Sequence, residues 1–229
     1  MKKIFKKKRI DEDKLVEKEP KEENQVLEQS DKEFDSFFSE VIKKMPSKTG
    51  KVILKSYESS KLRAEKILEN SKSQLDGQFD VFLKDVDSQT RKKCHTIIHA
   101  ASLTAAIIGC SPIPFSDAFL LVPVQLTMMA RLHKLFGQSW SESLGKSLSK
   151  ELIIVGLGRS TVGNIVKLVP GVGTVTGAAI NATVASTITE ALGWVTVKML
   201  NDGQDIFEEA MSFKGQYTML FKALRKSTK

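Results

Sequence analysis

The sequence contains few cysteines, few aromatic residues and no pattern of a secretory leader. Cys94 and Cys110 are the only cysteines among 229 residues, which excludes a scaffold held by several disulfides. No signal peptide is expected, because the basic start at Lys2–Arg9 is followed by the acidic Asp11–Asp13 and not by an apolar segment. Aliphatic residues are frequent enough in the middle of the chain to fill a core, which excludes a fully disordered protein.

Charge is very unevenly distributed along the chain. Residues 1–93 contain 42 charged side chains, whereas residues 94–200 contain only 11. The net charge of +8 does not indicate a nucleic-acid-binding protein, because the basic residues are interleaved with acidic ones and aromatic stacking platforms are absent. The basic block at the start of the chain is better suited to an anionic lipid surface, unless it is only a solvated end.

The composition divides the chain into three segments. Residues 1–29 predict a disordered charged tail, because they contain almost no aliphatic clusters. Residues 30–93 predict charged amphipathic helices, the first of which should begin at a capping box formed by Ser30 and Glu33 and end at Pro46. Residues 94–229 predict a charge-poor helical domain that ends in an amphipathic helix over about 203–226. The apolar positions that define the stripes in the second segment include Phe34, Phe37, Phe38, Val41, Ile42, Met45, Ile53, Leu54, Tyr57, Leu62, Ile67, Leu68, Leu75, Phe79, Phe82, Leu83 and Val86.

The third segment is rich in small neutral residues and in helix boundaries. A helix should begin near Ser116, kink at Pro123 and stop at Gly137, and another should run from about Ser141 to Val155. Asn201–Gly203 predicts a turn. No stretch alternates apolar and polar residues, so we predict an all-α fold of bundled helices and hairpins with a small-residue core and flanking amphipathic helices.

Two uncharged windows approach the length of about 20 apolar residues that a membrane-spanning helix needs. In Cys94–Ser116 the strongly apolar part, Ile97–Cys110, is 14 residues long, and 11 of the 22 residues of Leu168–Thr189 are Ala, Val, Ile or Leu. Small residues spaced as Gly173 and Gly177 suit both tight packing in a soluble core and contacts between membrane helices. Composition alone favours a buried hairpin over membrane insertion.

One group of neighbouring side chains contains residue types that bind metal ions. His95 and His99 lie four residues apart next to Cys94, so that one helix could direct both rings toward one ion. The residues between the histidines include no glutamate of the kind that zinc proteases use as a general base, and a third ligand would have to be Asp117 or His133. We therefore interpret these side chains as polar residues near a helix start, and expect no metal.

The glycine clusters do not predict a nucleotide site. Gly156–Gly158 and Gly171–Gly173 are followed by no Lys-Ser or Lys-Thr pair, which a phosphate loop requires. Ser111 and Ser116 have no His/Asp partner at recognisable spacing, and no paired carboxylates stand out. We expect neither a cofactor nor a catalytic site, and hence no enzyme.

Two ordered motifs carry a resemblance to a known family. Ser111–Asp117 followed by Leu121–Gln125, and Leu168–Gly173 followed by Thr189–Gly193, resemble the YcjF-type domain of unknown function over residues 94–200. This family occurs in bacteria, alone or joined to GTPase domains of the Era/dynamin-like kind, and several members are membrane proteins. The resemblance supplies no catalytic residue. It marks as structural motif positions Pro112, Pro114, Asp117, Pro170, Gly171, Gly173, Glu190 and Gly193.

The resemblance implies a function without chemistry of its own. The 93 residues before the matched region contain no phosphate loop, so any nucleotide hydrolysis would come from another chain. We expect a non-enzymatic helical module, associated with the cytoplasmic face of the cell membrane, either peripherally or through a short inserted hairpin. Its expected partners are membrane lipids and a GTPase or another protein in trans. The alternative is a soluble, homo-oligomeric helical interaction or regulatory protein of the cytoplasm.

Overall fold

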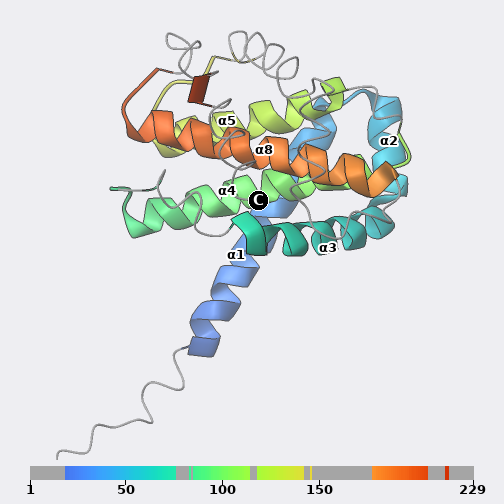
Figure 1. Ribbon diagram of the computed structural model, residues 1–229, viewed down its shortest axis with the longest axis horizontal. Coiled ribbons are helices and arrows are strands. Elements are labelled where there is room, and N and C mark those ends of the chain that lie inside the picture. The colour runs from blue at the N-terminus through green and yellow to red at the C-terminus, as the bar shows by residue number, and fades with distance from the viewer. Residues whose placement is uncertain are drawn as a thin grey trace, which may run out of the picture.

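The computed structural model describes residues 19–75, 83, 85–113, 118–141, 145, 177–205 and 215–216. This part of the chain is all-α, as predicted, and contains no strand. The described residues form six α-helices that pack as a bundle (Figure 1). In chain order the elements are α1 (Glu19–Lys44), α2 (Ser47–Lys55), α3 (Tyr57–Leu75), α4 (Ser88–Cys110), the short 3-10 helix η3 (Ala118–Leu121), α5 (Val122–Leu135) and α8 (Gly177–Asn201).

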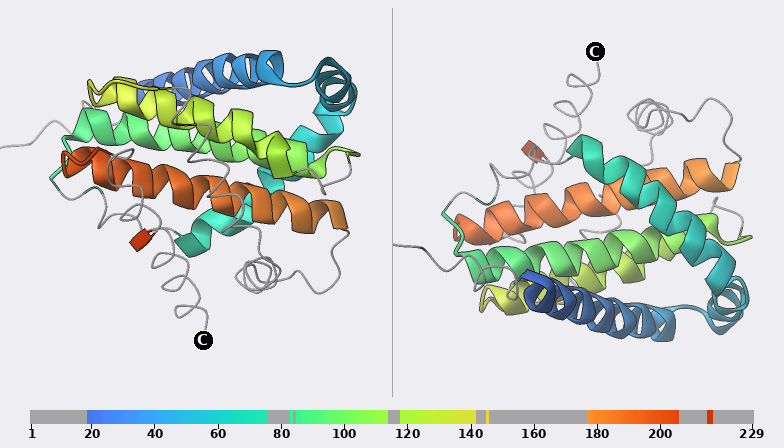
Figure 2. Two further views of the ribbon diagram at one scale, coloured as in Figure 1. Left: turned by 90° about the horizontal axis from the view of Figure 1, so that it is seen from above. Right: turned by 90° about the horizontal axis from the view of Figure 1, so that it is seen from below.

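Helix α4 lies at the centre of the bundle. It packs along α8 and is also contacted by α1, α3 and α5. Gly109 lies against Ala182 and Ile98 against Gly193, so α4 and α8 run antiparallel. Figure 2 shows α1 and α5 side by side along α4, while α3 crosses α4 and α8 on another side. Because neighbours surround α4, every residue from Ala100 to Cys110 is buried.

The sequence explains why α4 can be central. Asp87 caps its start by accepting hydrogen bonds from the amides of Gln89 and Thr90, and the helix ends at Cys110, two residues before Pro112. The last 17 residues of α4, from Cys94 onward, carry no Asp, Glu, Lys or Arg. A helix that is apolar or neutral on all sides is stable only when it is surrounded by other elements.

The predicted start of the first helix was wrong. Helix α1 begins at Glu19 and continues through Ser30 and Glu33 without a break, so these two residues form no capping box. Helix α1 thus includes residues 19–29 of the segment predicted as a charged tail, whereas residues 1–18 lie outside the described part. Glutamate, lysine and glutamine favour helix even without an apolar face, and the ion pair of Lys32 with Glu28 supports the added turns.

The second predicted stripe is divided between two helices. Helix α2 ends at Lys55 and α3 begins at Tyr57, with Ser56 between them. Leu54 and Leu62 are exposed, with 54% and 63% of their surface in contact with solvent, although the stripe had placed both in the core. Ile53 and Leu68 are buried as predicted. Helical periodicity identified the apolar residues but could not reveal the change of direction at Ser56.

Proline and glycine determine several further boundaries. Pro123 does not kink a longer helix: it lies in the first turn of α5, directly after η3, where its missing amide hydrogen leaves no hydrogen bond unmade. Gly137 follows the end of α5 with φ +69°, and Gly203 follows α8 with φ +71°, so both predicted stops are confirmed. The helices predicted over 141–155 and 203–226 lie almost entirely outside the described residues, as do Phe79 and Phe82.

Candidate functional site

Helices α4 and α8 approach each other closely at Gly109. A Cβ atom added to Gly109 would lie 2.5 Å from the Cα atom of Ala182, so only glycine fits at this crossing. Gly193 of α8 faces side chains instead, and its added Cβ atom would lie 2.8 Å from Cγ1 of Ile98 and 3.0 Å from the sulfur of Met128. The two helices thus pack backbone to backbone at one end and through side chains farther along.

Polar groups without partners lie inside this packing. Ser102 Oγ in α4, Gln125 Oε1 in α5 and Thr189 Oγ1 in α8 are buried and accept or donate no hydrogen bond within the described part of the chain. The contacts of Gly109 with Ala182 and of Ile98 with Gly193 place Ser102 level with Thr189 along the antiparallel pair. An unsatisfied buried polar group costs about 1–3 kcal/mol of stability. These side chains therefore make the bundle less stable than apolar side chains at the same positions would.

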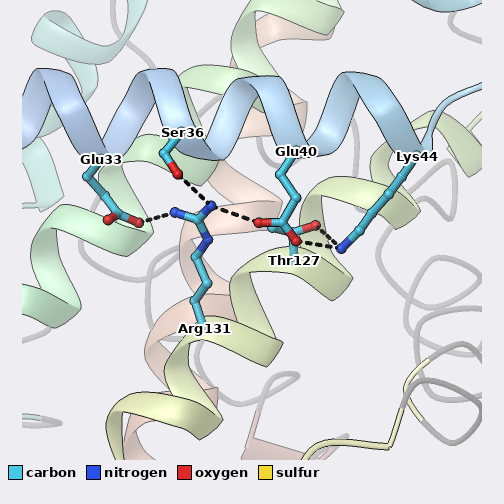
Figure 3. A network of polar contacts seen from close by, with 6 residues as sticks. All are labelled: Glu33, Ser36, Glu40, Lys44, Thr127 and Arg131. Atoms are coloured by element: carbon cyan, nitrogen blue, oxygen red, sulfur yellow. Dashed lines mark hydrogen bonds and ion pairs between the residues drawn. The ribbon is translucent and has the colours of Figure 1, made fainter.

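A network of ion pairs and hydrogen bonds joins α1 to α5. The guanidinium of Arg131 in α5 donates to Oε1 of Glu33, to Oε2 of Glu40 at 2.7 Å and to Oγ of Ser36 at 3.2 Å (Figure 3). Glu33, Ser36 and Glu40 are spaced three and four residues apart, so they share one face of α1. A single arginine therefore contacts two successive turns of the neighbouring helix.

A second cation extends this network toward the end of α1. Lys44 donates to Oε1 of Glu40 at 2.7 Å and to Oγ1 of Thr127 at 3.1 Å (Figure 3). Burial alone would raise the pKa of Glu40, but the hydrogen bonds from Lys44 and Arg131 outweigh burial and lower that pKa below 4.5. The guanidinium of Arg131 also lies 5.1 Å from the ring centre of Phe37, a cation–π contact. The network therefore combines charge pairing with apolar contact.

The structure describes only part of the predicted motif positions. Pro112 is exposed just after α4, Glu190 is half-buried in α8, and Gly193 is buried between α4 and α5. Pro114, Asp117, Pro170, Gly171 and Gly173 lie outside the described residues. Among the described motif positions, Gly193 has a role that follows from its contacts: because it has no side chain, Ile98 and Met128 can pack against it.

The possible metal ligands do not converge. Cys94 is buried, and burial raises the pKa of its thiol to about 12, whereas His95 and His99 are exposed. The ring of His95 packs edge-on against Trp194 at 4.7 Å between centres. His133 is buried elsewhere, with Nδ1 2.8 Å from the carbonyl oxygen of Met129. Among the residues that the structure describes, no three His, Cys, Asp or Glu side chains form a group that could hold a metal ion.

Sequence reasoning missed Arg131. Its only signal in the sequence is that it is one of two Asp, Glu, Lys or Arg residues between Asp117 and Ser141, the other being Lys134. A cation in a helix whose other residues are mostly apolar needs a partner from another element, and the spacing of Glu33 and Glu40 on one helix face could have suggested that partner.

Comparisons with known proteins agree with the resemblance. The profile of a domain of unknown function, DUF697, matches residues 74–225 and so begins about 20 residues earlier than the motifs indicated. Magnetosome membrane protein 22 of Magnetospirillum gryphiswaldense is 34% identical over 127 residues, which cover 53% of this chain and 64% of that protein. No solved structure matches. No helix within the described ranges is long and apolar enough to cross a membrane.

Proposed function

Because the chain belongs to the family of the DUF697 domain of unknown function, we propose that it is a non-enzymatic helical module of the cytoplasmic face of the cell membrane. In this proposal the module binds the membrane and docks a GTPase or another protein in trans. The described part of the chain forms a helical bundle in which a polar network joins α1 to α5. No chemical reaction is proposed for it.

One observation carries the membrane part of the proposal. Helices α4 and α8 meet through small residues at backbone distance, with Gly109 against Ala182, and α4 has no formal charge from Cys94 to its end. Close contact through small residues is the packing that membrane helices use, where apolar side chains gain nothing from leaving lipid. The relative named as a magnetosome membrane protein supports the same association.

A second surface suits the protein partner. Among the described residues, the exposed large hydrophobic side chains are Val52, Leu54 and Leu62, on α2 and α3. These two helices are otherwise rich in charged residues, and apolar side chains on a polar surface are suited to contacts with another protein. Residues 19–73 also precede the matched domain, so the family match does not include this surface.

The soluble homo-oligomer is the less favoured candidate. A homo-oligomer of this kind requires the small residues of the central helices to form an interface between chains. In the structure Gly109, Ala182 and Gly193 are used inside one chain, where α4 packs against α8 and α5. These positions are therefore not available to a second copy unless the bundle opens.

Membrane fractionation tests the proposal. The full chain should sediment with membranes in low salt and float with vesicles that contain anionic phospholipid. A wash with alkaline carbonate then separates peripheral association, which it releases, from an inserted hairpin, which it does not. Complete recovery in the soluble fraction at low salt, with no flotation, would contradict the membrane association.

The partner surface needs a separate measurement. Leu54→Ser combined with Leu62→Ser should weaken co-purification of the bound protein while leaving flotation unchanged, since neither side chain is buried. The matched control is Lys48→Ser with Lys51→Ser, two exposed positions of α2. If the control removes the bound protein as effectively as the leucine pair, the leucines are not the docking surface.

A further inference from the structure

A small cavity lies where α1, α4 and α5 meet. Its volume is about 280 Å³, and it is lined by Glu33, Gln89, Lys92, Lys93, Thr96, Ile97 and Leu135. Four of these residues, from Gln89 to Thr96, are spaced three and four apart and therefore form one polar stripe along the first turns of α4. Ile97 and Leu135 supply an apolar wall. The cavity is thus cationic on one side and apolar on the other.

The two lysines of the cavity are not neutralised by the described protein. The carboxylate of Glu33, the acidic residue in the lining, is engaged by Arg131. Neither Lys92 nor Lys93 forms an ion pair with any residue that the structure describes. Both lysines are exposed, so an anion can reach them from solvent.

The helix amides are not part of this site. Asp87 already accepts hydrogen bonds from the amides of Gln89 and Thr90, at 3.0 Å each. An anion in the cavity would therefore be held by side chains: the two ammonium groups and the amide of Gln89. Thr96 donates its hydroxyl hydrogen to the carbonyl oxygen of Lys92, so its oxygen remains only as an acceptor.

The chemistry of the lining suits one class of anion. Lysine is a common ligand of phosphate groups, which it binds as a point charge. The volume lies below the range of about 300–1,000 Å³ that is usual for pockets holding whole small molecules, so it suits one phosphate group with a few carbon atoms. We propose that this cavity binds the phosphate group of an anionic phospholipid, with Ile97 and Leu135 against the adjoining apolar part. This inference rests on the proposed membrane association and names the lipid chemistry that serves it.

Vesicle flotation with matched double variants tests the site. Wild-type full chain, Lys92→Gln/Lys93→Gln and Lys48→Gln/Lys51→Gln would be mixed with phosphatidylcholine vesicles with and without phosphatidic acid. Both variants lose two positive charges, so general attraction to an anionic surface falls equally. The cavity variant should lose at least about tenfold in partitioning onto phosphatidic acid vesicles, and the α2 variant about twofold or less. Lys92→Arg/Lys93→Arg should keep most of the binding, and far-UV circular dichroism checks that each variant is folded.

A second arm uses inorganic phosphate alone and separates this proposal from the membrane proposal. Phosphate should raise the melting temperature of the wild type relative to chloride of equal ionic strength, and should not raise that of Lys92→Gln/Lys93→Gln. If phosphate raises the melting temperature in this way but the wild type floats with no vesicle, the cavity binds a soluble phosphate compound. The proposed membrane association is then wrong. If both double variants lose vesicle binding equally and phosphate has no effect, the cavity is not a phosphate site.

Discussion

Among the described glycines, Gly109 is the one where an added carbon atom would meet backbone atoms of another helix at less than 3 Å. Its Cβ position lies 2.5 Å from Cα and 2.6 Å from N of Ala182, which are backbone atoms that cannot rotate away. We expect Gly109→Ala to lower the free energy of unfolding by about 3 kcal/mol, because α4 and α8 must separate to admit the methyl group. Urea denaturation followed by circular dichroism measures this change.

Gly50 provides the matched control, since it is also buried within a helix. An added Cβ atom there would meet Cγ2 of Ile42 at 3.6 Å, an ordinary contact. Gly50→Ala should therefore stabilise the protein by about 0.5–1 kcal/mol, because alanine loses less backbone entropy in a helix. Equal effects of the two substitutions would contradict the close crossing of α4 and α8.

The sequence does not show which small residue of α4 makes the close contact with α8. The stretch from Ala100 to Gly109 contains several small residues, and the helical pattern treats them alike. The crossing with Ala182 joins positions 73 residues apart, and no local rule fixes that register. Gly193 shows the opposite case, because the motif marked it before its contacts with Ile98 and Met128 were known.

At the scale of helices, Arg131 adds to the apolar contacts that hold α1 on the bundle. Arg131→Met removes its hydrogen bonds to Glu33, Ser36 and Glu40 and leaves two carboxylates near each other. We expect a loss of about 1–2 kcal/mol in the free energy of unfolding, since the network is only partly buried. Hydrogen exchange should show faster opening of α1 around Phe37 and little change in α8.

The control for this substitution is an ion pair that contacts no second helix. Lys32→Met removes the pair with Glu28, whose side chains are 73% and 67% exposed. Its effect should stay within about 0.5 kcal/mol. Uniform acceleration of exchange in α1 and α8 by Arg131→Met would mean that the arginine stabilises the whole bundle and not the attachment of α1.

The same network makes stability depend on pH. Because the pKa of Glu40 is lowered below 4.5 in the folded protein, its ionised form is favoured by folding. This contribution is complete above about pH 4.5 and is lost as the pH falls through the lowered pKa. The difference in unfolding free energy between wild type and Glu40→Gln should therefore be constant near neutral pH and shrink in acid. Urea titrations across this range measure it, and a difference that grows in acid would contradict the assignment.

The helices could be predicted from the sequence far better than their contacts. The stops at Gly137 and Gly203 depend on backbone conformations that glycine adopts readily, so they were visible locally. The start of α1 was missed because Ser30 and Glu33 have the spacing of a cap even though a helix already runs through them. The pairing of Arg131 with α1 was missed because ion pairs between distant segments depend on how the helices pack.

At the scale of the whole molecule, the family match and the bundle have different boundaries. The matched domain begins at residue 74, whereas α1, α2 and α3 up to Ser73 precede it. Of these helices, α1 packs on α4 and α5, and α3 packs on α4 and α8. The covering face of α1 buries Phe34, Phe37, Phe38 and Val41. The matched helices therefore depend, in this chain, on a cover that the family profile does not include.

Removing this cover should change how the chain behaves in water. A variant that lacks residues 1–73 would expose the faces of α4 and α5 on which those side chains pack, and each large apolar side chain contributes about 1.5–3 kcal/mol when buried. We expect this variant to aggregate without detergent and to bind vesicles more strongly than the full chain. A variant lacking only residues 1–18 keeps α1 and should stay as monodisperse in water as the full chain. Size-exclusion chromatography with light scattering distinguishes these outcomes. If the variant lacking residues 1–73 is a monodisperse monomer, α4, α5 and α8 need no cover from the preceding helices. Other residues of the matched domain would then have to cover the apolar face.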